Sequence, residues 1–197
     1  MENRAVLMHY IFIIFSKSIR IISLSIWSLY GRFFLRMIGC KLGANSIFYG
    51  KVRAGSNGIG ITLGDGCWVG ADFFLSISRG AEIDIGKNVS FNTGFHMSAM
   101  SRICIGEGTA IAEYVTIRDQ NHNFSDSSKP ISEQGYSSSP IYIGKNVWIG
   151  RGCFIGPGVI IGDGAVIGAN SVVVSNIPNN TLAVGAPAKV IRVIEEK

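Results

Sequence analysis

The carboxyl-terminal part of the chain repeats itself every six residues, and this period restricts the fold more than any other feature. From Ile143 the sequence reads IGKNVW, IGRGCF, IGPGVI, IGDGAV and IGANSV, with isoleucine and glycine opening every step. Looser copies occur earlier, as at Leu63, Val69 and Leu75, which are also six apart. Six residues are no multiple of a 3.6-residue helical turn, and β-branched residues are frequent, so a helical array is excluded.

Three such steps, about 18 residues, close one triangular coil in a repeat architecture. Each side is a short strand, and each corner is a turn that glycine or asparagine can enter at positive φ. The first residue of each step points inward and stacks on its counterpart, so each coil is buried only by its neighbours. We therefore predict an all-β parallel β-helix over residues 42–178. It has about six coils, roughly at 42–60, 63–80, 85–102, 105–119, 143–160 and 161–178.

Residues 1–41 have a different composition and form a separate, apolar and basic segment. Its only acidic residue is Glu2, and its basic residues are Arg4, Lys17, Arg20, Arg32, Arg36 and Lys41. The longest uncharged run, at 5–16, is short of the roughly 20 residues that span a bilayer. Polar residues recur at steps of three to five and predict an amphipathic helix: Lys17, Arg20, Ser23, Ser28, Arg32 and Arg36. Residues 1–38 are expected either to lie on the cytoplasmic face of the cell membrane or to pack on the protein's own oligomer.

The overall composition describes one globular domain with a short appendage. Hydrophobic residues make up 47% of the 197 residues and charged residues 16%, which argues against disorder. The four cysteines form no Cys-x-x-Cys pair, so no metal site is expected, and Cys67 and Cys153 are interpreted as core residues. A reducing, cytoplasmic location is the simplest inference. The net charge of +5 comes without aromatics interleaved among the basic residues, so nucleic-acid binding is not predicted.

The sequence from Val147 to Arg192 carries a specific resemblance. It reads VWIGRGCFIGPGVIIGDGAVIGANSVVVSNIPNNTLAVGAPAKVIR and resembles the hexapeptide-repeat acyltransferases, in particular the sugar and polysaccharide O-acetyltransferases. The resemblance covers residues 40–194. It implies a left-handed coil, acetyl-CoA as co-substrate, and a homotrimer with active sites between subunits. The acceptor that it implies is a hydroxyl of a bacterial surface glycan or its precursor.

The repeat breaks at residues 120–140, which are rich in serine, asparagine and proline. A long insertion in a compact array is usually functional. In the family that the chain resembles, such a loop projects and closes an active site with the next subunit. His122, at its base, matches the family's catalytic histidine. A neutral sugar hydroxyl is a poor nucleophile, and a base that titrates near neutrality can remove its proton during attack on the thioester.

Further site residues are expected around this histidine. Asp119, Glu133 or a backbone carbonyl would orient it, although either carboxylate could also be a solvated charge. Asn92 falls where the family places an acceptor-binding residue, or is only a corner turn. His96 could reach the acceptor but suits a structural role better. Trp148 would lie against the thioester end of the coenzyme or only seal its coil.

The resemblance also places the coenzyme. The backbone near Gly150, Gly168 and Ala169 would contact the pantetheine arm, and Lys189 and Arg192 in the 179–197 tail would meet the phosphates. Arg151 stands where many relatives have serine, and Val174 and Ser175 replace a common threonine–lysine pair. Arg151 is therefore a further candidate for a phosphate contact.

Four other functions are consistent with part of the sequence. An antibiotic or other small-molecule O-acetyltransferase uses the same chemistry and stays open. A serine acetyltransferase would need a larger helical domain than residues 1–41 provide. A zinc carbonic anhydrase needs three histidine ligands, whereas only His96 and His122 fall in the predicted β-helix. A non-catalytic scaffold would have no use for the loop histidine and the coenzyme-binding tail.

Overall fold

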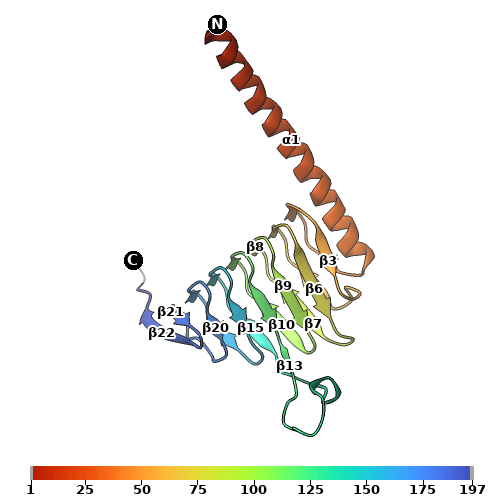
Figure 1. The fold of residues 1–197 in the computed structure, drawn as a ribbon, viewed down its shortest axis with the longest axis vertical. Coiled ribbons are helices and arrows are strands. Elements are labelled where there is room, and N and C mark those ends of the chain that lie inside the picture. Colours follow the sequence, from red (N-terminus) through yellow and green to blue (C-terminus); the bar gives the residue numbers. More distant parts are fainter. Residues whose placement is uncertain (1, 196–197) are drawn as a thin grey trace.

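The chain folds into one long helix followed by a β-helix. A computed structural model describes residues 2–195, and the side chains of Ile19 and of residues 21–195 (Figure 1). Helix α1 (Glu2–Met37) projects away from a stack of triangular coils, and the carboxyl terminus lies at the opposite end of the stack. The predicted fold class is confirmed: the strands form parallel sheets around a solenoid of about six coils, which is consistent with the left-handed coil of the family that the chain resembles.

Each of the three faces of the coils is one sheet. Sheet A holds β1 (Lys41–Leu42), β4 (Ile61–Leu63), β7 (Glu82–Ile85), β10 (Arg102–Ile105), β15 (Ile141–Ile143) and β18 (Ile160–Ile161). Sheet B holds β2 (Ile47–Phe48), β5 (Trp68–Val69), β8 (Ser90–Phe91), β11 (Ala110–Ile111), β16 (Trp148–Ile149), β19 (Val166–Ile167), β21 (Thr181–Gly185) and β22 (Ala188–Val193). Sheet C holds β3 (Val52–Ala54), β6 (Phe73–Ile77), β9 (His96–Ala99), β12 (Thr116–Arg118), β17 (Phe154–Ile155) and β20 (Val172–Val173).

The register of these sheets stacks the repeat residues into buried files. Ile85, Ile105, Ile143 and Ile161 pair in sequence across sheet A, and all four are buried. Outward residues alternate with them along each strand, because successive side chains point to opposite faces. The wider early coils are filled by aromatic rings, with Phe73 packed 5.1 Å from Phe91 and 5.4 Å from Phe95. The inward-facing side chains of the coils are therefore mostly apolar. Side chains able to do chemistry are expected on the outer faces, at the corners and in the insertion.

The glycines of the hexapeptide serve two different purposes. In the strict repeat from Ile143, the corner residues at positive φ come three positions after the repeat isoleucine and are asparagine or glycine, as at Asn146 and Gly152. Two earlier corners use Asp72 and Tyr114 at the same position. The glycine directly after the isoleucine has ordinary φ and is required by the neighbouring coil. A Cβ at Gly150 would come within 2.6 Å of the amide nitrogen of Ala169, closer than any real contact. This glycine sets the spacing between coils.

Cysteines fill the small inward positions as predicted. Cys40, Cys67 and Cys153 are buried with free thiols. Burial raises the pKa of the Cys40 thiol to about 11, and burial also raises the pKa of Cys67 and Cys153. These thiols stay protonated near neutrality and are unreactive core residues.

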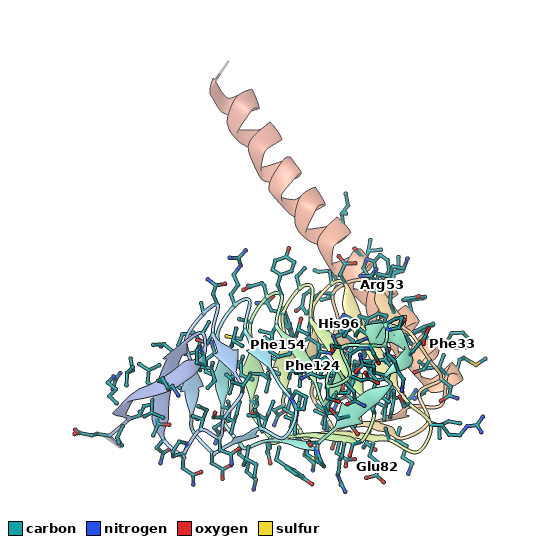
Figure 2. All side chains as sticks on the ribbon, turned by 60° about the horizontal axis from the view of Figure 1, so that its bottom comes forward. Phe33, Arg53, Glu82, His96, Phe124 and Phe154 are labelled. Atoms are coloured by element: carbon teal, nitrogen blue, oxygen red, sulfur yellow. The ribbon has the colours of Figure 1, made fainter. Side chains whose placement is uncertain are left out.

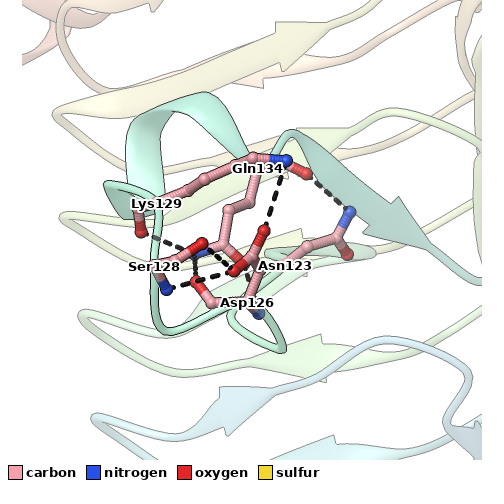
Figure 3. Close-up of polar contacts among 5 residues, drawn as sticks. All are labelled: Asn123, Asp126, Ser128, Lys129 and Gln134. Carbon is pink, nitrogen blue, oxygen red and sulfur yellow. Dashed lines mark hydrogen bonds and ion pairs between the residues drawn. The ribbon is translucent and has the colours of Figure 1, made fainter.

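The insertion is more ordered than the sequence predicts. It contains an antiparallel ribbon, β13 (Gln120–His122) and β14 (Tyr136–Ser138), and a 3₁₀ turn, η1 (Ile131–Glu133). Figure 3 shows how the Gln134 amide holds the loop: its Nε2 donates to the carbonyls of Asp126 (2.8 Å) and Lys129 (3.0 Å), and its Oε1 accepts from the Asp126 amide. Asp126 also accepts hydrogen bonds from Ser128, which lower the pKa of its carboxyl. The loop therefore projects with a defined conformation.

Helix α1 meets the first coil through Leu35, which is buried in the core, and through polar side chains on the same side. The Ser28 hydroxyl donates to the Phe48 carbonyl (3.2 Å) and accepts from the Phe48 amide (3.1 Å), and Arg32 Nε donates to the Ser46 carbonyl (2.9 Å). Large apolar side chains of the same helix are exposed: Ile19, Ile21, Ile22, Ile26, Leu29, Phe33 and Met37. Two members of the predicted polar stripe, Ser28 and Arg32, thus face the protein. The side chains of Lys17 and Arg20 lie outside the described ones.

No helical stretch among the described residues is long and apolar enough to cross a membrane. Helix α1 is one continuous element of 36 residues, but its apolar side chains are interrupted by basic ones. Its polar contacts with the first coil involve the carboxyl-terminal half, and Figure 1 shows the amino-terminal half extending beyond the coils.

Candidate functional site

One extended strand carries the polar side chains that lie nearest the insertion. The chain leaves sheet C through β12 and continues into β13, so that residues 118, 120 and 122 alternate along one side. Arg118 pairs in register with Ser98 on the outer face of sheet C. Gln120 Nε2 donates to the Ser98 hydroxyl (2.8 Å), which shows that this side of β13 turns toward the same outer face. Arg118, Gln120 and His122 therefore form one row, called the β12–β13 row below.

This row contains all the unpaired buried side-chain atoms in the described part of the chain. Arg118 Nε, Gln120 Oε1 and His122 Nδ1 are shielded from solvent and have no hydrogen-bond partner there. Each such group costs about 1–3 kcal/mol relative to a paired one. Three in one row form an incomplete polar site that a ligand or a neighbouring subunit would complete.

His122 itself is half-buried on β13 and packs against the loop's returning strand. Its ring centroid lies 4.2 Å from that of Tyr136, the residue directly opposite in the ribbon. The ribbon fixes the position of the imidazole, while the unpaired Nδ1 leaves its tautomer unassigned within the chain.

Asp119 does not contact His122 but fastens the corner from which the loop departs. Its side chain is fully buried, and its two carboxylate oxygens accept hydrogen bonds from the amides of Met100 (2.7 Å) and Ser101 (2.8 Å). Its own carbonyl accepts from the Ser139 amide (2.9 Å), where the chain returns to the coil. In the single chain, Asp119 thus has structural contacts and makes no hydrogen bond to His122.

Glu133 is also not a hydrogen-bond partner of His122. It lies exposed on η1, and within the described residues no hydrogen bond joins its carboxylate to His122. Neither carboxylate predicted from the sequence thus orients the imidazole in the single chain.

Asn92 lies at the other edge of sheet C, in a polar corner. Its Nδ2 donates to Glu113 (2.8 Å) on the next coil, and its Oδ1 accepts from the Thr93 amide (3.0 Å). Two coils further along the same corner, the Arg151 guanidinium lies 5.7 Å from the centre of the Tyr114 ring. The amide of Asn92 is therefore engaged in corner contacts, and the width of sheet C separates it from His122.

Trp148 is on a different face from His122. It projects from β16 on sheet B and is 57% exposed, although an aromatic that only sealed its coil would be covered. Within one chain, sheet C lies between the corner that follows Trp148 and the corner that carries His122. Within one chain the two side chains therefore lie on different faces of the β-helix.

The residues predicted to hold the coenzyme gather near Trp148. Gly150 and Ala169 occupy neighbouring positions of the corner that follows sheet B, and Gly168 approaches the Val184 side chain. Lys189 and Arg192 are exposed on β22, which closes sheet B. The close coil contacts at Gly150 and Gly168 give these glycines a structural reason that is independent of any ligand.

His96 lies on the outer face of sheet C, packed against Phe74 with ring centroids 4.5 Å apart and ring planes tilted by 35°. Burial, and then the charges of Arg118 and Arg53, lower the pKa of its imidazole. His96 is thus close to the β12–β13 row. Within the described residues, no three histidine, cysteine or acidic side chains gather as ligands for a metal.

Sequence reasoning found His122 but missed Arg118, Gln120 and Tyr136. The alternation of residues 118, 120 and 122 through the break in the repeat is a signal that could have found the first two. Tyr136 lies fourteen residues further along, and only the pairing of β13 with β14 brings it to His122.

Known proteins are similar to this chain in the hexapeptide repeat and in the fold of most of its length. Two family models match: the bacterial transferase hexapeptide (six repeats) at residues 140–175 and the hexapeptide repeat of succinyl-transferase at residues 39–75. AntD, an N-acyltransferase from Bacillus cereus solved with dTDP-4-amino-4,6-dideoxyglucose and coenzyme A, has the same fold. The TM-score is 0.67 at 20% identity, over 84% of this chain and 89% of that one.

Two relatives come from Escherichia coli K12. WbbJ, named for O-acetyl transfer in lipopolysaccharide biosynthesis, is 37% identical over 139 residues, which cover 67% of this chain and 71% of WbbJ. Galactoside O-acetyltransferase is 38% identical over 136 residues, which cover 69% of this chain and 65% of that enzyme. The chain spans between 37% and 71% of the length of the curated relatives that it matches. With this repeat, fold and degree of identity, the chain belongs to the hexapeptide-repeat acetyltransferase family.

Proposed function

We propose that this protein moves an acetyl group from acetyl-CoA to a hydroxyl of a bacterial surface glycan, such as a capsule, O-antigen or exopolysaccharide, or of its precursor. The observation that carries the proposal is His122, held by an ordered ribbon at the base of the insertion with an unpaired ring nitrogen in the β12–β13 row. The names of the two Escherichia coli relatives, which refer to O-acetyl transfer on lipopolysaccharide and on galactosides, support the acceptor class.

The chemistry is a single direct transfer. His122 takes the proton of the acceptor hydroxyl while the hydroxyl oxygen attacks the thioester carbonyl carbon. The tetrahedral intermediate collapses as the carbon–sulfur bond breaks, and the imidazolium returns the proton to the coenzyme A thiolate. The products are an acetyl ester and free coenzyme A, and no acyl-enzyme is needed.

The reaction is tested by thiol release. Purified protein with acetyl-CoA and a panel of acceptors should release coenzyme A thiol in proportion to acceptor acetylation, with surface polysaccharides and their oligosaccharides as the best acceptors. If only antibiotics or similar small molecules are acetylated, the small-molecule alternative is correct. If no acceptor supports thiol release above slow hydrolysis, the enzyme proposal fails.

We place the active site between subunits of a homotrimer. His122 and Trp148 lie on different faces of one chain, and a cyclic assembly would bring the loop of one copy to sheet B of the next. Acetyl-CoA would then lie between two β-helices, with Trp148 at its thioester and Gly150, Arg151, Gly168, Ala169, Lys189 and Arg192 along its length.

Mixing two inactive variants tests this arrangement. We expect His122→Ala and Trp148→Ala trimers, unfolded together and reassembled, to recover about a quarter of the parental activity, because each mixed trimer contains one intact interface. The separately refolded variants are the control. Recovery of nothing from verified mixed trimers would mean that the two residues act within one chain.

We further propose that the exposed apolar side of α1 binds the cytoplasmic face of the cell membrane. Its exposed residues, from Ile19 to Met37, recur at steps of three and four on the side turned away from the first coil, and residues 1–41 are basic. This pattern suits anionic lipid.

Vesicle flotation distinguishes binding of α1 to the membrane from packing of α1 on other copies of the chain. The full chain is expected to float with vesicles containing anionic lipid and to float less with neutral ones, whereas a chain lacking residues 1–38 stays at the bottom. Ile26→Asp on the exposed side should weaken flotation. Ser25→Asp is the matched control, because it adds the same charge at the neighbouring position without removing an apolar side chain. Loss of trimerisation in the shortened chain without any flotation of the full chain would show that α1 packs on other copies.

A further inference from the structure

The outer face of sheet C beside His122 carries a concentration of positive charge. Arg118 is half-buried at the centre of this face, and in the described part of the chain it has neither an ion pair nor a hydrogen bond, while its Nε is shielded from water. A guanidinium is always charged and presents a planar fork of donors that matches an oxyanion. The shielded Nε of Arg118 is therefore a donor without an acceptor in the β12–β13 row.

One further cation, Arg53, lies in the neighbouring row of the same face, together with the imidazole of His96. Arg53, Phe74, His96 and Thr116 pair in sequence from β3 to β12, and the charges of Arg118 and Arg53 contribute to the lowered pKa of His96. Figure 2 labels Arg53 and His96 on this face.

The nearby acidic groups do not neutralise this face. Asp72 lies 3.8 Å from Arg53 as an exposed pair, and such pairs are weak in water. Asp119 is committed to two backbone amides, and Glu113 lies at the far corner with Asn92. Arg118 is left without a counter-charge.

The same face offers flat apolar surfaces for a sugar ring. Phe74 and His96 pack side by side with ring centroids 4.5 Å apart, and Phe154 follows Thr116 in the same row. All of these side chains are at least partly exposed. Aromatic faces pack well against the C–H faces of sugar rings, while neighbouring polar groups fix their orientation.

We propose that this face binds an acceptor sugar that carries an anionic group, a carboxylate or a phosphate, with Arg118 as its ion-pair partner and Phe74 and His96 beneath the ring. The proposal rests on the proposed function and narrows its acceptor to acidic glycans or phosphorylated precursors. Gln120 Oε1, unpaired in the same row, would accept a hydrogen bond from a sugar hydroxyl and help to direct another hydroxyl toward His122.

Kinetics with matched acceptor pairs test this inference. The acceptors are glucose and glucuronate oligosaccharides of equal length, and glucose against glucose 1-phosphate, so that the carboxylate and the phosphate are compared separately. The parent should have a kcat/KM at least about tenfold higher for one anionic member of a pair, and Arg118→Gln should lower that preference about 10–100-fold. Arg118→Lys should restore part of it. Lys87→Gln, which removes one exposed charge at the opposite corner, should change nothing.

Other outcomes overturn the inference in distinct ways. A rise in KM for acetyl-CoA alone in Arg118→Gln would place the arginine on the donor. Dissociation of the trimer by the same variant would mean that Arg118 pairs with a neighbouring subunit. Efficient transfer to neutral acceptors without preference would refute this inference and leave the proposed function standing, whereas absence of transfer to every acceptor would refute both.

A measurement on the unaltered protein gives an independent check. An anion bound beside Arg118 should raise the pKa of His96 when the imidazole is followed by NMR in the presence of glucuronate oligosaccharide or glucose 1-phosphate. Glucose should leave it in place. No shift with any saturating anionic acceptor would contradict the proposed position of the anion.

Discussion

His122→Ala is expected to lower kcat for acetyl transfer by about 10²–10⁴-fold, the usual contribution of a general base. The KM for acetyl-CoA should change little, because the coenzyme residues are proposed to lie near Trp148 on another face. His122→Gln keeps a hydrogen-bonding side chain of similar size but cannot take a proton, so it should be almost as slow. The measurement is steady-state thiol release with the best acceptor of the panel.

The control for loop integrity is Ser127→Ala, an exposed residue of the same insertion that makes no side-chain hydrogen bond among the described residues. It should retain parental activity. Glu133→Gln should retain it too, because that carboxylate lies exposed on η1. A His122→Ala protein that folds, forms its trimer and transfers acetyl at the parental rate would remove histidine from the mechanism.

The largest effect on stability is expected from Asp119→Ala. The fully buried carboxylate accepts two hydrogen bonds from backbone amides, each worth about 1.5–3 kcal/mol when one partner is charged. Its removal leaves both amides unpaired and should lower the free energy of unfolding by about 3 kcal/mol or more. Asp119→Asn keeps one acceptor and should lose about half as much, again at roughly 1.5 kcal/mol per bond. Denaturant unfolding at one fixed protein concentration measures these differences in an oligomer.

Asp126→Ala is the matched control, since this aspartate belongs to the same insertion but is partly exposed and hydrogen bonds only within the loop. It should lower the free energy of unfolding much less than Asp119→Ala does. If Asp119→Ala were no more costly than this control, the buried carboxylate would not be the fastening point of the insertion. The same variant also tests whether Asp119 acts in the active site, because a stable but inactive Asp119→Ala protein would support that role.

The architecture was largely predictable because the six-residue repeat of the sequence determines it locally. Six-residue spacing places Ile143, Ile149 and Ile155 on successive inward sites, and no other regular structure satisfies that spacing. The period could not distinguish the two kinds of glycine, because turn conformation and close approach between coils both favour the absence of a side chain.

The site was predictable only in part, because its contacts join distant segments. His122 could be selected as the one histidine at a break in the repeat. The contacts of Asp119 are with the amides of Met100 and Ser101, one coil earlier, and the sequence between Asp119 and His122 carries no sign of them. The sequence did not show which side of α1 faces the first coil. A polar stripe faces water only when its hydroxyl and guanidinium groups have no hydrogen-bond partner in the protein. Here Ser28 and Arg32 hydrogen bond to the first coil.

The bond formed in the product tests the central proposal most directly. Transfer from acetyl-CoA labelled with ¹³C at the carbonyl, to an acceptor that contains both hydroxyl and amino groups, distinguishes an ester from an amide by chemical shift and by release in mild alkali. We predict an alkali-labile ester whose formation requires His122. An alkali-stable amide, or ester formation at an equal rate in folded His122→Ala trimers, would contradict the account.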